Sequence, residues 1–184
     1  MFQQIIAAIY VFLPAYLANS APVIFDKFGL LKSLKKPIDG GVKIGKDYLF
    51  GETKTWRGLV AGVMVGAITG GIIWAITSLY MSYLGGVSQL ISAVGYGLYY
   101  GAVLGFGIIM GDLIKSFIKR RLHIKSTDPF FPFDQMDYLG ALILGYFLFP
   151  FFQPYFWILL IISPLFPILA NLIAYKLGWK KVWW

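Results

Sequence analysis

The sequence contains no cysteine, which excludes disulfide bonds, thiolate metal sites and cysteine nucleophiles. Charge is scarce over long stretches: residues 1–25, 58–111 and 138–175 contain no Asp, Glu, Lys or Arg. Hydrophobic residues make up 59% of the 184 positions, and the mean hydropathy is +0.74. No remaining segment is large enough to hold a soluble core of its own. The composition therefore predicts an integral membrane protein.

The lengths of the three uncharged blocks predict how often the chain crosses the bilayer. One helical crossing needs about 20 apolar residues, so the first block fits one crossing and each later block fits two. We therefore expect an all-α integral membrane protein with five transmembrane helices in a single domain, residues 1–184. The expected helices are residues 3–25, 58–83, 88–115, 136–153 and 155–177. Two charged loops, residues 26–57 and 112–137, lie between these helices, and we expect them to form the functional site.

The distribution of charge predicts the orientation. After one crossing and two returning pairs, both charged loops and the C-terminal tail must lie on the same side of the membrane. They carry all 16 Lys and Arg residues against eight Asp and Glu residues, and basic loops stay in the cytoplasm. We expect the N-terminus outside, the C-terminus in the cytoplasm and the functional site on the cytoplasmic face of the cell membrane. A net charge of +8 favours anionic partners, either lipid headgroups or phosphorylated substrates.

Glycine and proline predict how the helices pack and where they break. A spacing of four residues lets two helices approach closely. It occurs in the second expected helix and again in the third, at Gly58, Gly62, Gly66 and Gly70 and at Gly97, Gly101 and Gly105. Pro150 and Pro154 shorten the fourth crossing, so a broken or re-entrant segment is an alternative there. Pro164 predicts a kink in the fifth.

Charged side chains gather where the third expected helix leaves the bilayer. Their spacings of three and four residues place them on one helix face: Asp112, Lys115, Ser116, Lys119 and Arg120. Asp134 and Asp137 follow at the start of the fourth helix. Carboxylates are the ligands that Mg²⁺ prefers, together with substrate phosphates, and the basic residues could neutralise those phosphates.

A structural alternative accounts for the same residues without any chemistry. Asp134 could cap the fourth helix, with Asp137 in its first turn complementing the helix dipole. The basic residues would then only anchor the end of the third helix. Spacing alone does not decide between the two interpretations.

Together, these residues resemble the signature of the phosphatidate cytidylyltransferase family. The matching positions are Gly111-Asp112, Ser116, Lys119-Arg120, Lys125 and Asp134-x-x-Asp137. The His-Gly-Gly run of the bacterial and eukaryotic form is replaced here by Phe131-Pro-Phe, so no role of that histidine is carried over. The sequence is more similar to the archaeal CDP-archaeol synthase branch. That resemblance rests on Pro-Ile-Asp-Gly-Gly (37–41), Phe-Gly with Lys-Thr-Trp-Arg-Gly (50–58) and Asp-Pro-Phe-Phe-Pro-Phe-Asp-Gln (128–135).

The resemblance implies an enzyme that transfers CMP from CTP to 2,3-bis-O-geranylgeranylglyceryl phosphate, an isoprenoid ether lipid phosphate, with Mg²⁺ as cofactor. It implies catalytic roles for Asp112, Lys119, Arg120, Asp134 and Asp137. Metal ligation would fall to the three aspartates among them. No nucleic acid and no obligate protein partner are expected. The single histidine, His123, is expected to be a loop residue rather than a general base, because a phosphate monoester is already largely ionised at neutral pH.

The resemblance also implies nucleotide contacts outside the acidic motif. The expected CTP-binding residues are Asn19, Asp39, Lys54, Thr55, Arg57, Lys115 and Ser116. For two of them a structural interpretation stays open: Lys54 and Arg57 could be basic anchors beside an interfacial Trp56. Asp39 could equally be part of an Asp-Gly-Gly turn.

A membrane transporter or channel for an anionic substrate is the main alternative function. Such proteins place functional ionisable groups within the bilayer. Here the uncharged blocks contain no Asp, Glu, Lys, Arg or His, and every charged candidate residue lies at one interface. The pattern favours an enzyme that meets a soluble nucleotide and a membrane lipid.

Overall fold

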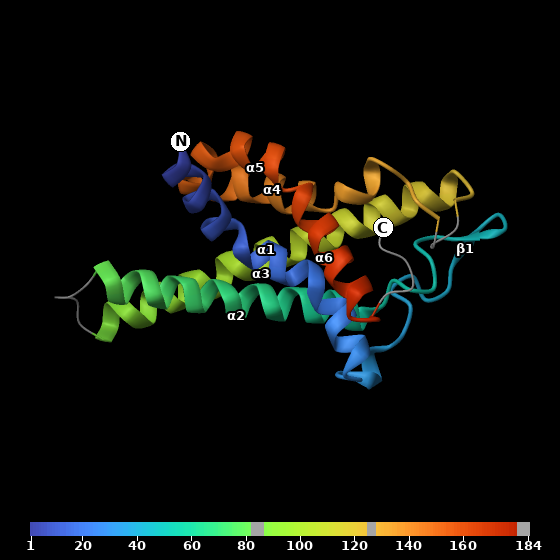
Figure 1. Cartoon of the computed structure of the whole chain (residues 1–184). Coiled ribbons are helices and arrows are strands. Elements are labelled where there is room, and N and C mark those ends of the chain that lie inside the picture. Colours follow the sequence, from blue (N-terminus) through green and yellow to red (C-terminus); the bar gives the residue numbers. More distant parts are fainter. Residues whose placement is uncertain (82–86, 125–127, 180–184) are drawn as a thin grey trace.

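The computed structural model describes residues 1–81, 87–124 and 128–179, which are helical apart from loops and one short hairpin (Figure 1). Three long helices dominate: α1 (Phe2–Lys27), α2 (Trp56–Met81) and α3 (Val87–Arg121). Each is long and apolar enough to span a membrane. Lys125 and residues 82–83, the expected end of the second helix, lie outside the described residues.

The loop between α1 and α2 contains a 3₁₀ turn, η1 (Lys32–Leu34), and a hairpin of β1 (Lys43–Ile44) and β2 (Asp47–Tyr48). Its strands are antiparallel, with Lys43 opposite Tyr48. Thr55 caps α2 at the end of this loop, because its hydroxyl accepts a hydrogen bond from the N–H of Gly58 at 3.3 Å. Figure 1 shows that the hairpin, the start of α2 and the end of α3 lie at one end of the bundle.

α3 is longer than the sequence predicts. It runs to Arg121 rather than ending near residue 115, so the expected second loop begins as a helix. Ser116 and Lys119 are buried on this extension, and its last turn holds Lys119, Arg120 and Arg121. Basic side chains at a helix C-terminus interact favourably with the helix dipole. The extension therefore carries the candidate site residues on a rigid element.

The C-terminal third departs in its bounds from the two helices predicted at residues 136–153 and 155–177, and it breaks at the prolines that predicted a broken or kinked segment. A 3₁₀ turn, η2 (Phe133–Gln135), precedes α4 (Tyr138–Leu148), which has 11 residues. η3 (Pro150–Tyr155) continues into α5 (Phe156–Ile162), and α6 (Leu165–Lys176) follows at a bend of 54°. Among the described residues, three helices qualify as spans, or four if this bent pair counts as one.

Proline accounts for both breaks. Pro150 ends α4 because a proline disfavours helical backbone in the residue before it, and Phe149 is extended there. Pro164 has no N–H to donate to the carbonyl of Leu160. The hydroxyl of Tyr138 donates to that carbonyl instead, at 3.3 Å. α4 alone is shorter than the roughly 20 residues that a crossing needs.

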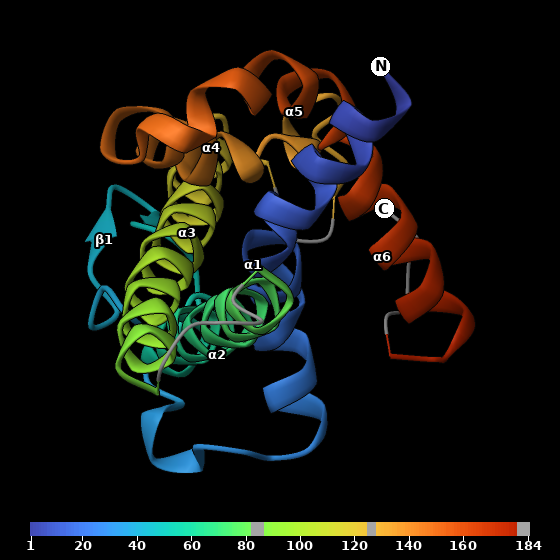
Figure 2. The same cartoon turned by 90° about the vertical axis from the view of Figure 1, so that its left-hand side faces the viewer.

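Glycines bring α2 and α3 into backbone contact over much of their length, so the predicted close packing is confirmed. A Cβ atom at Gly101 would lie 2.0 Å from the carbonyl oxygen of Gly66, and one at Gly70 would lie 2.2 Å from that of Gly97. Viewed along the bundle, α2 and α4 lie on different sides of α3 (Figure 2). α3 is therefore the central element of the bundle.

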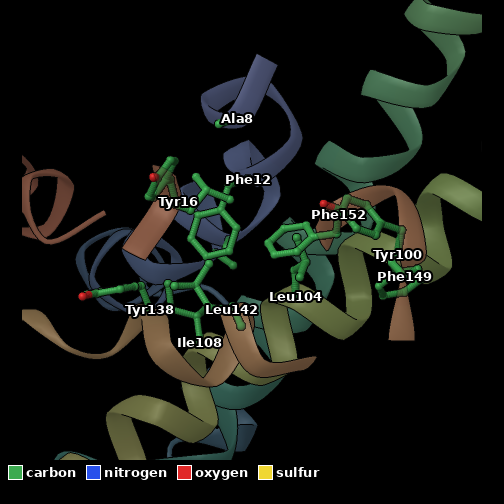
Figure 3. Close-up of a cluster of buried hydrophobic side chains, with 14 of the residues drawn as sticks. Ala8, Phe12, Tyr16, Tyr100, Leu104, Ile108, Tyr138, Leu142, Phe149 and Phe152 are labelled. Atoms are coloured by element: carbon green, nitrogen blue, oxygen red, sulfur yellow. The ribbon is translucent and has the colours of Figure 1, made fainter. Parts of the chain in front are cut away.

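An aromatic cluster joins α1, α3, α4 and η3 (Figure 3). Phe12, Tyr100 and Phe152 are fully buried, and the ring of Tyr100 meets that of Phe149 edge to face at 4.8 Å between centroids. The Tyr100 hydroxyl donates to the carbonyl of Val11 at 2.8 Å. Val11 lies within one turn of Pro14, a proline inside α1. The cluster holds η3 against the bundle and thereby positions the end of α4.

We expect Gly101→Ala to lower the thermal stability of the purified protein. The added methyl group must push α2 away from α3, and overpacking of this kind costs about 1–3 kcal/mol. Gly95→Ala is the matched control, because a Cβ there meets nothing within 4 Å. It should leave the melting temperature unchanged or raise it slightly, since alanine favours helix. Equal melting temperatures for the two variants would contradict the assigned helix contact.

Candidate active site

The site is built on the face of α3 that the sequence predicts. Asp112, Lys115, Ser116 and Lys119 all point toward partners on other segments rather than toward lipid. The spacing of three and four residues along a helix explains why their side chains share this face. Charged side chains with so little exposure to water need partners of opposite charge. Residues of both loops supply these partners.

Asp112 and Lys115 form the centre of the site. Oδ2 of Asp112 pairs with Lys54 of the first loop, and Oδ1 lies 3.1 Å from Nζ of Lys115. The same Nζ lies 2.7 Å from Oδ1 of Asp137, just before α4. One ammonium group therefore sits between two carboxylates from different elements. Lys54, which the resemblance assigns to CTP binding, thus lies against Asp112 of α3.

A further ion pair lies one helical turn along α3 from the Asp112–Lys115 pair. Nζ of Lys119 is 3.3 Å from Oδ1 of Asp134 and donates to the carbonyl of Asp128 at 2.6 Å. Oδ2 of Asp134 accepts a hydrogen bond from the N–H of Phe130. These contacts fold residues 128–134 back over the exposed end of α3. The two pairs share one side of the helix.

The alternative in which the aspartates only cap the fourth helix is wrong. Asp134 lies in η2, ahead of α4, and Asp137 occupies the cap position without a side-chain capping hydrogen bond. Both carboxylates turn instead to lysines of α3. Burial, reinforced by the charge of Asp112, raises the pKa of Asp137 to about 6. The ammonium of Lys115 opposes this rise in pKa, because it favours the ionised carboxylate.

Glycines that the sequence reasoning did not assign to the site place Asp137 against α3. A Cβ at Gly111 would lie 2.1 Å from the carbonyl oxygen of Asp137. A Cβ at Gly140 would lie 2.0 Å from the carbonyl oxygen of Gly107. The available signal was the four-residue spacing of Gly107 and Gly111, which sets a second contact face on α3. Without this close approach, Lys115 would not reach both carboxylates.

Three of the expected nucleotide-binding residues act here as structural ties. Ser116 donates from its hydroxyl to the carbonyl of Phe50 at 2.6 Å, which fastens the first loop to α3. Thr55 caps α2. Both carboxylate oxygens of Asp39 accept backbone N–H groups, from Gly41 at 2.9 Å and Phe50 at 3.0 Å. For Asp39 this arrangement favours the turn interpretation.

Arg57 and Asn19 do not join the central cluster. Arg57 is buried at the start of α2 and pairs with Asp26 at the end of α1. Asn19 is half-buried on α1, and its side chain has no hydrogen bond within the described ranges. Arg120 turns back and donates to the carbonyl of Ile124 at 2.9 Å.

A cleft of about 310 Å³ lies beside the cluster, between the hairpin loop and α3. It is lined by Lys46, Asp47, Tyr48, Gly51, Glu52, Thr53 and Arg120. Gly51 has a φ of +104°, and a Cβ there would lie 3.2 Å from Nε of Arg120, so a side chain at this position would strain the loop and crowd the arginine. His123 is an exposed residue whose Nδ1 lies 2.7 Å from Oδ2 of Asp47. It ties the hairpin to the end of α3, which fits the expected loop role.

The donor set fits a hard divalent cation only in part. In the described ranges, no group of three acidic or histidine side chains is close enough to share one metal ion. Asp112 and Asp137 nevertheless converge on one positive charge, the ammonium of Lys115. Two carboxylates completed by substrate phosphates are a common Mg²⁺ environment. Asp134 is engaged with Lys119 and the backbone and stands apart from this pair.

Residues 1–184 match the model of the CarS-like CDP-archaeol synthase family. The chain belongs to the CDP-archaeol synthase family. A CDP-archaeol synthase of Pyrococcus horikoshii is 38% identical over 184 residues, covering 98% of this chain and 98% of the relative. One of Thermococcus onnurineus is 36% identical over 180 residues, covering 96% and 95%. The family predicted from the sequence motifs is thereby confirmed.

A solved structure is similar as well. It is described as an intramembrane enzyme for archaeal membrane lipids biosynthesis. It has a TM-score of 0.58 and 32% sequence identity, and the alignment covers 78% of each chain. Together with the long apolar helices, this similarity shows that this member of the CDP-archaeol synthase family is a multi-pass membrane protein.

We expect Lys115→Met to destabilise the folded protein strongly in buffer with a chelator. The variant leaves Asp137 without its cation, and breaking a buried ion pair typically costs about 3–5 kcal/mol. The double variant Lys115→Met/Asp137→Asn should recover much of the loss, because no unpaired charge remains at that position. Melting temperatures measured by intrinsic fluorescence provide the comparison.

Lys46→Met serves as the control, because Lys46 is exposed on the hairpin. If it lowered the melting temperature as much as Lys115→Met, the central ion pairs would not be what stabilises this end of the bundle.

Proposed function

We propose that this protein transfers CMP from CTP to 2,3-bis-O-geranylgeranylglyceryl phosphate, forming the CDP-activated ether lipid and pyrophosphate. The observation that carries the proposal is the full-length match to CDP-archaeol synthases. The geometry supports it, because the family-like acidic and basic residues meet where α3 ends and both loops converge. A soluble nucleotide and a membrane lipid can both reach such a place.

The reaction is a displacement at the α-phosphorus of CTP. An oxygen of the lipid phosphate forms the new P–O bond, and the bond to pyrophosphate breaks. A phosphate monoester has a second pKa near 6, so the attacking oxygen is largely ionised at neutral pH without a general base. The exposed position of His123, paired with Asp47, agrees with a mechanism that does not use it. Catalysis then depends on positioning and on charge stabilisation.

The lysines are the residues that would bind the phosphates. Lys54, Lys115 and Lys119 each reach an aspartate, and each can turn its ammonium group to a phosphate oxygen when the nucleotide arrives. Arg120 lines the adjacent cleft and can approach the same anion. The aspartates keep these cations in place in the absence of the substrate. When the nucleotide binds, the lysines exchange their aspartate partners for phosphate oxygens. They do not first have to be moved out of water.

Mg²⁺ is the cofactor we propose, with Asp112 and Asp137 as its protein ligands. Bound there, it would neutralise charge that develops on the phosphate oxygens in the transition state. The displaced ammonium of Lys115 would become available to the substrate. Asp134 would act by holding Lys119 and the loop at residues 128–134.

Transport of an anionic substrate is not favoured. A transport pathway needs polar or ionisable groups at bilayer depth, whereas the acidic and basic cluster lies at one end of the helices. Along α2 and α3 the glycine-rich faces are closed by backbone contact, which leaves no space between these two helices.

We further propose five crossings with the site on the cytoplasmic face. α4 with η3 would form a short fourth crossing, and the bent pair of α5 and α6 a fifth. The hairpin, the start of α2 and the charged end of α3 would then be cytoplasmic, as the excess of Lys and Arg in these segments favours. No nucleic acid and no obligate protein partner enter the proposal.

We expect the purified protein to form CDP-lipid from labelled CTP and the geranylgeranylated glyceryl phosphate in the presence of Mg²⁺. Asp137→Asn and Asp112→Asn should each lower kcat by about 10²–10³, the usual effect of losing one transition-state contact. Asp134→Asn should lower it as well, through the loss of its hold on Lys119. Thin-layer separation of the labelled lipid measures the product.

Asp47→Asn is the matched control, because this aspartate lies in the hairpin and pairs with His123. It should retain activity close to that of the parent. Full activity of folded Asp137→Asn would show that the site is misplaced, and a parent that binds CTP without transferring CMP would contradict the proposed reaction.

The orientation can be tested by cysteine labelling, since the natural chain has no cysteine. Lys46→Cys places a thiol on the hairpin, and Tyr80→Cys places one at the far end of α2, where Tyr80 is 85% exposed. In intact cells, a membrane-impermeant maleimide should label only the Tyr80→Cys protein, and Lys46→Cys should react after permeabilisation. The reverse pattern would place the site outside.

A further inference from the structure

A basic and apolar surface follows α1 directly, and the reaction described above does not use it. We define it as the lysine loop, residues 27–36, which contains η1. It carries four lysines and no acidic residue: Lys27, Lys32, Lys35 and Lys36. All four are exposed. Within the part of the chain that the structure describes, Lys35 alone among them has an ion pair, with the exposed Asp26 at 3.6 Å.

Large apolar side chains are exposed on the same loop. Phe28 is 65% exposed and Leu30 is 46% exposed. Gly29 and Leu31 have positive φ angles of 62° and 48°, so the backbone turns sharply between the two apolar residues and again directly after Leu30. The ring of Phe28 meets that of Trp179, which follows α6, at 6.4 Å between centroids. Exposed aromatic residues beside lysines are typical of the headgroup level of a membrane.

The position of the loop sets its depth. α1 is a candidate membrane span that ends at Lys27, so the lysine loop begins where the hydrocarbon layer ends. Lysine clusters immediately after a transmembrane helix bind anionic lipid headgroups. The apolar side chains would lie at the edge of the hydrocarbon layer. The ammonium groups would lie among the lipid phosphates of the same leaflet. Charge and depth therefore both match an anionic lipid surface.

The loop also leads directly to the active site. The carbonyl of Lys36 accepts the N–H of Trp56 at 3.0 Å, and the N–H of Ile38 donates to the carbonyl of Lys54 at 2.8 Å. Lys54 in turn pairs with Asp112. Two backbone hydrogen bonds thus join the end of the lysine loop to the segment that supplies a cation to the centre of the site.

We propose that the lysine loop is a docking surface for the phosphate headgroups of anionic lipids, and that it concentrates such lipids beside the active site. The docking itself follows from charge, exposure and depth. The concentration of substrate rests on the proposed function, since the lipid acceptor of that reaction is itself an anionic phosphate lipid. Docking involves no chemical step, so it should affect the apparent affinity for the lipid and leave kcat unchanged.

A binding measurement tests docking without any turnover. The parent is placed in bilayers containing brominated phosphatidylglycerol or brominated phosphatidylcholine, and quenching of tryptophan fluorescence is compared. The anionic lipid should quench more strongly than the neutral lipid. Lys32→Gln/Lys36→Gln should lose this preference, whereas the hairpin pair Lys43→Gln/Lys46→Gln removes equal charge and should keep it. Equal quenching by the two lipids in the parent, or an unchanged preference in Lys32→Gln/Lys36→Gln, would overturn the proposal.

A kinetic measurement tests delivery. In neutral bilayers, Lys32→Gln/Lys36→Gln should raise KM for the lipid substrate, in mole fraction, at least about fivefold. The anionic group that the lysines meet there is the substrate headgroup, and each lysine beside an anionic lipid contributes roughly a factor of five in affinity. The kcat and the KM for CTP should not change. Added phosphatidylglycerol should raise the lipid KM of the parent by competition and leave that of the variant unaffected.

The alternatives give distinct results. If the lysines attract the nucleotide instead, KM for CTP rises in Lys32→Gln/Lys36→Gln, and the proposal is wrong. If both double variants change the lipid KM equally, the effect is general charge rather than this loop, which also contradicts it. A parent with no CMP transfer contradicts the proposed reaction, and the quenching experiment then decides docking alone.

Discussion

Backbone contact at glycine is the constraint on which the rest of the structure depends. Gly66, Gly70 and Gly101 let α2 lie directly on α3, and Gly107 and Gly111 let the start of α4 do the same on another face. Lipid tails offer helices no hydrophobic reason to associate, so close van der Waals packing must supply the attraction. These contacts also decide where the charged ends of the helices meet. A methyl group added at a contact glycine would displace the whole helix, and its terminal residues would move with it.

The charges in turn constrain what the site can be. Lys115 sits between Asp112 and Asp137, and each of these groups would be unfavourable if it were left alone in a poorly hydrated place. The arrangement is therefore stable without substrate, and it holds cations and carboxylates together, the groups that the proposed phosphoryl transfer and the proposed Mg²⁺ would use. It lies where α3 ends, so a lipid can approach from the bilayer and a nucleotide from water.

Much of this was predictable from local patterns. The uncharged blocks predicted helices near α1, α2 and α3, and the spacing of Asp112, Lys115 and Lys119 predicted their shared face. The prolines indicated breaks after α4 and at Pro164, but not that α5 and α6 would be separate helices bent by 54°. The motif near residues 50–58 indicated that Lys54 belongs with the site, whereas Arg57, three residues later, turns to Asp26.

The sequence alone determined that this protein is a membrane protein and that its charged residues share particular helix faces. It also determined which family the chain resembles. These properties depend on composition and on periodicity, which are local. Only the tertiary structure decided which charges meet. Asp137 belongs with Lys115 and Asp134 with Lys119, and Asp39 is used by its own turn. The two ion pairs join residues of different elements, and they depend on how closely Gly111 allows α4 to approach α3, which no local sequence pattern specifies.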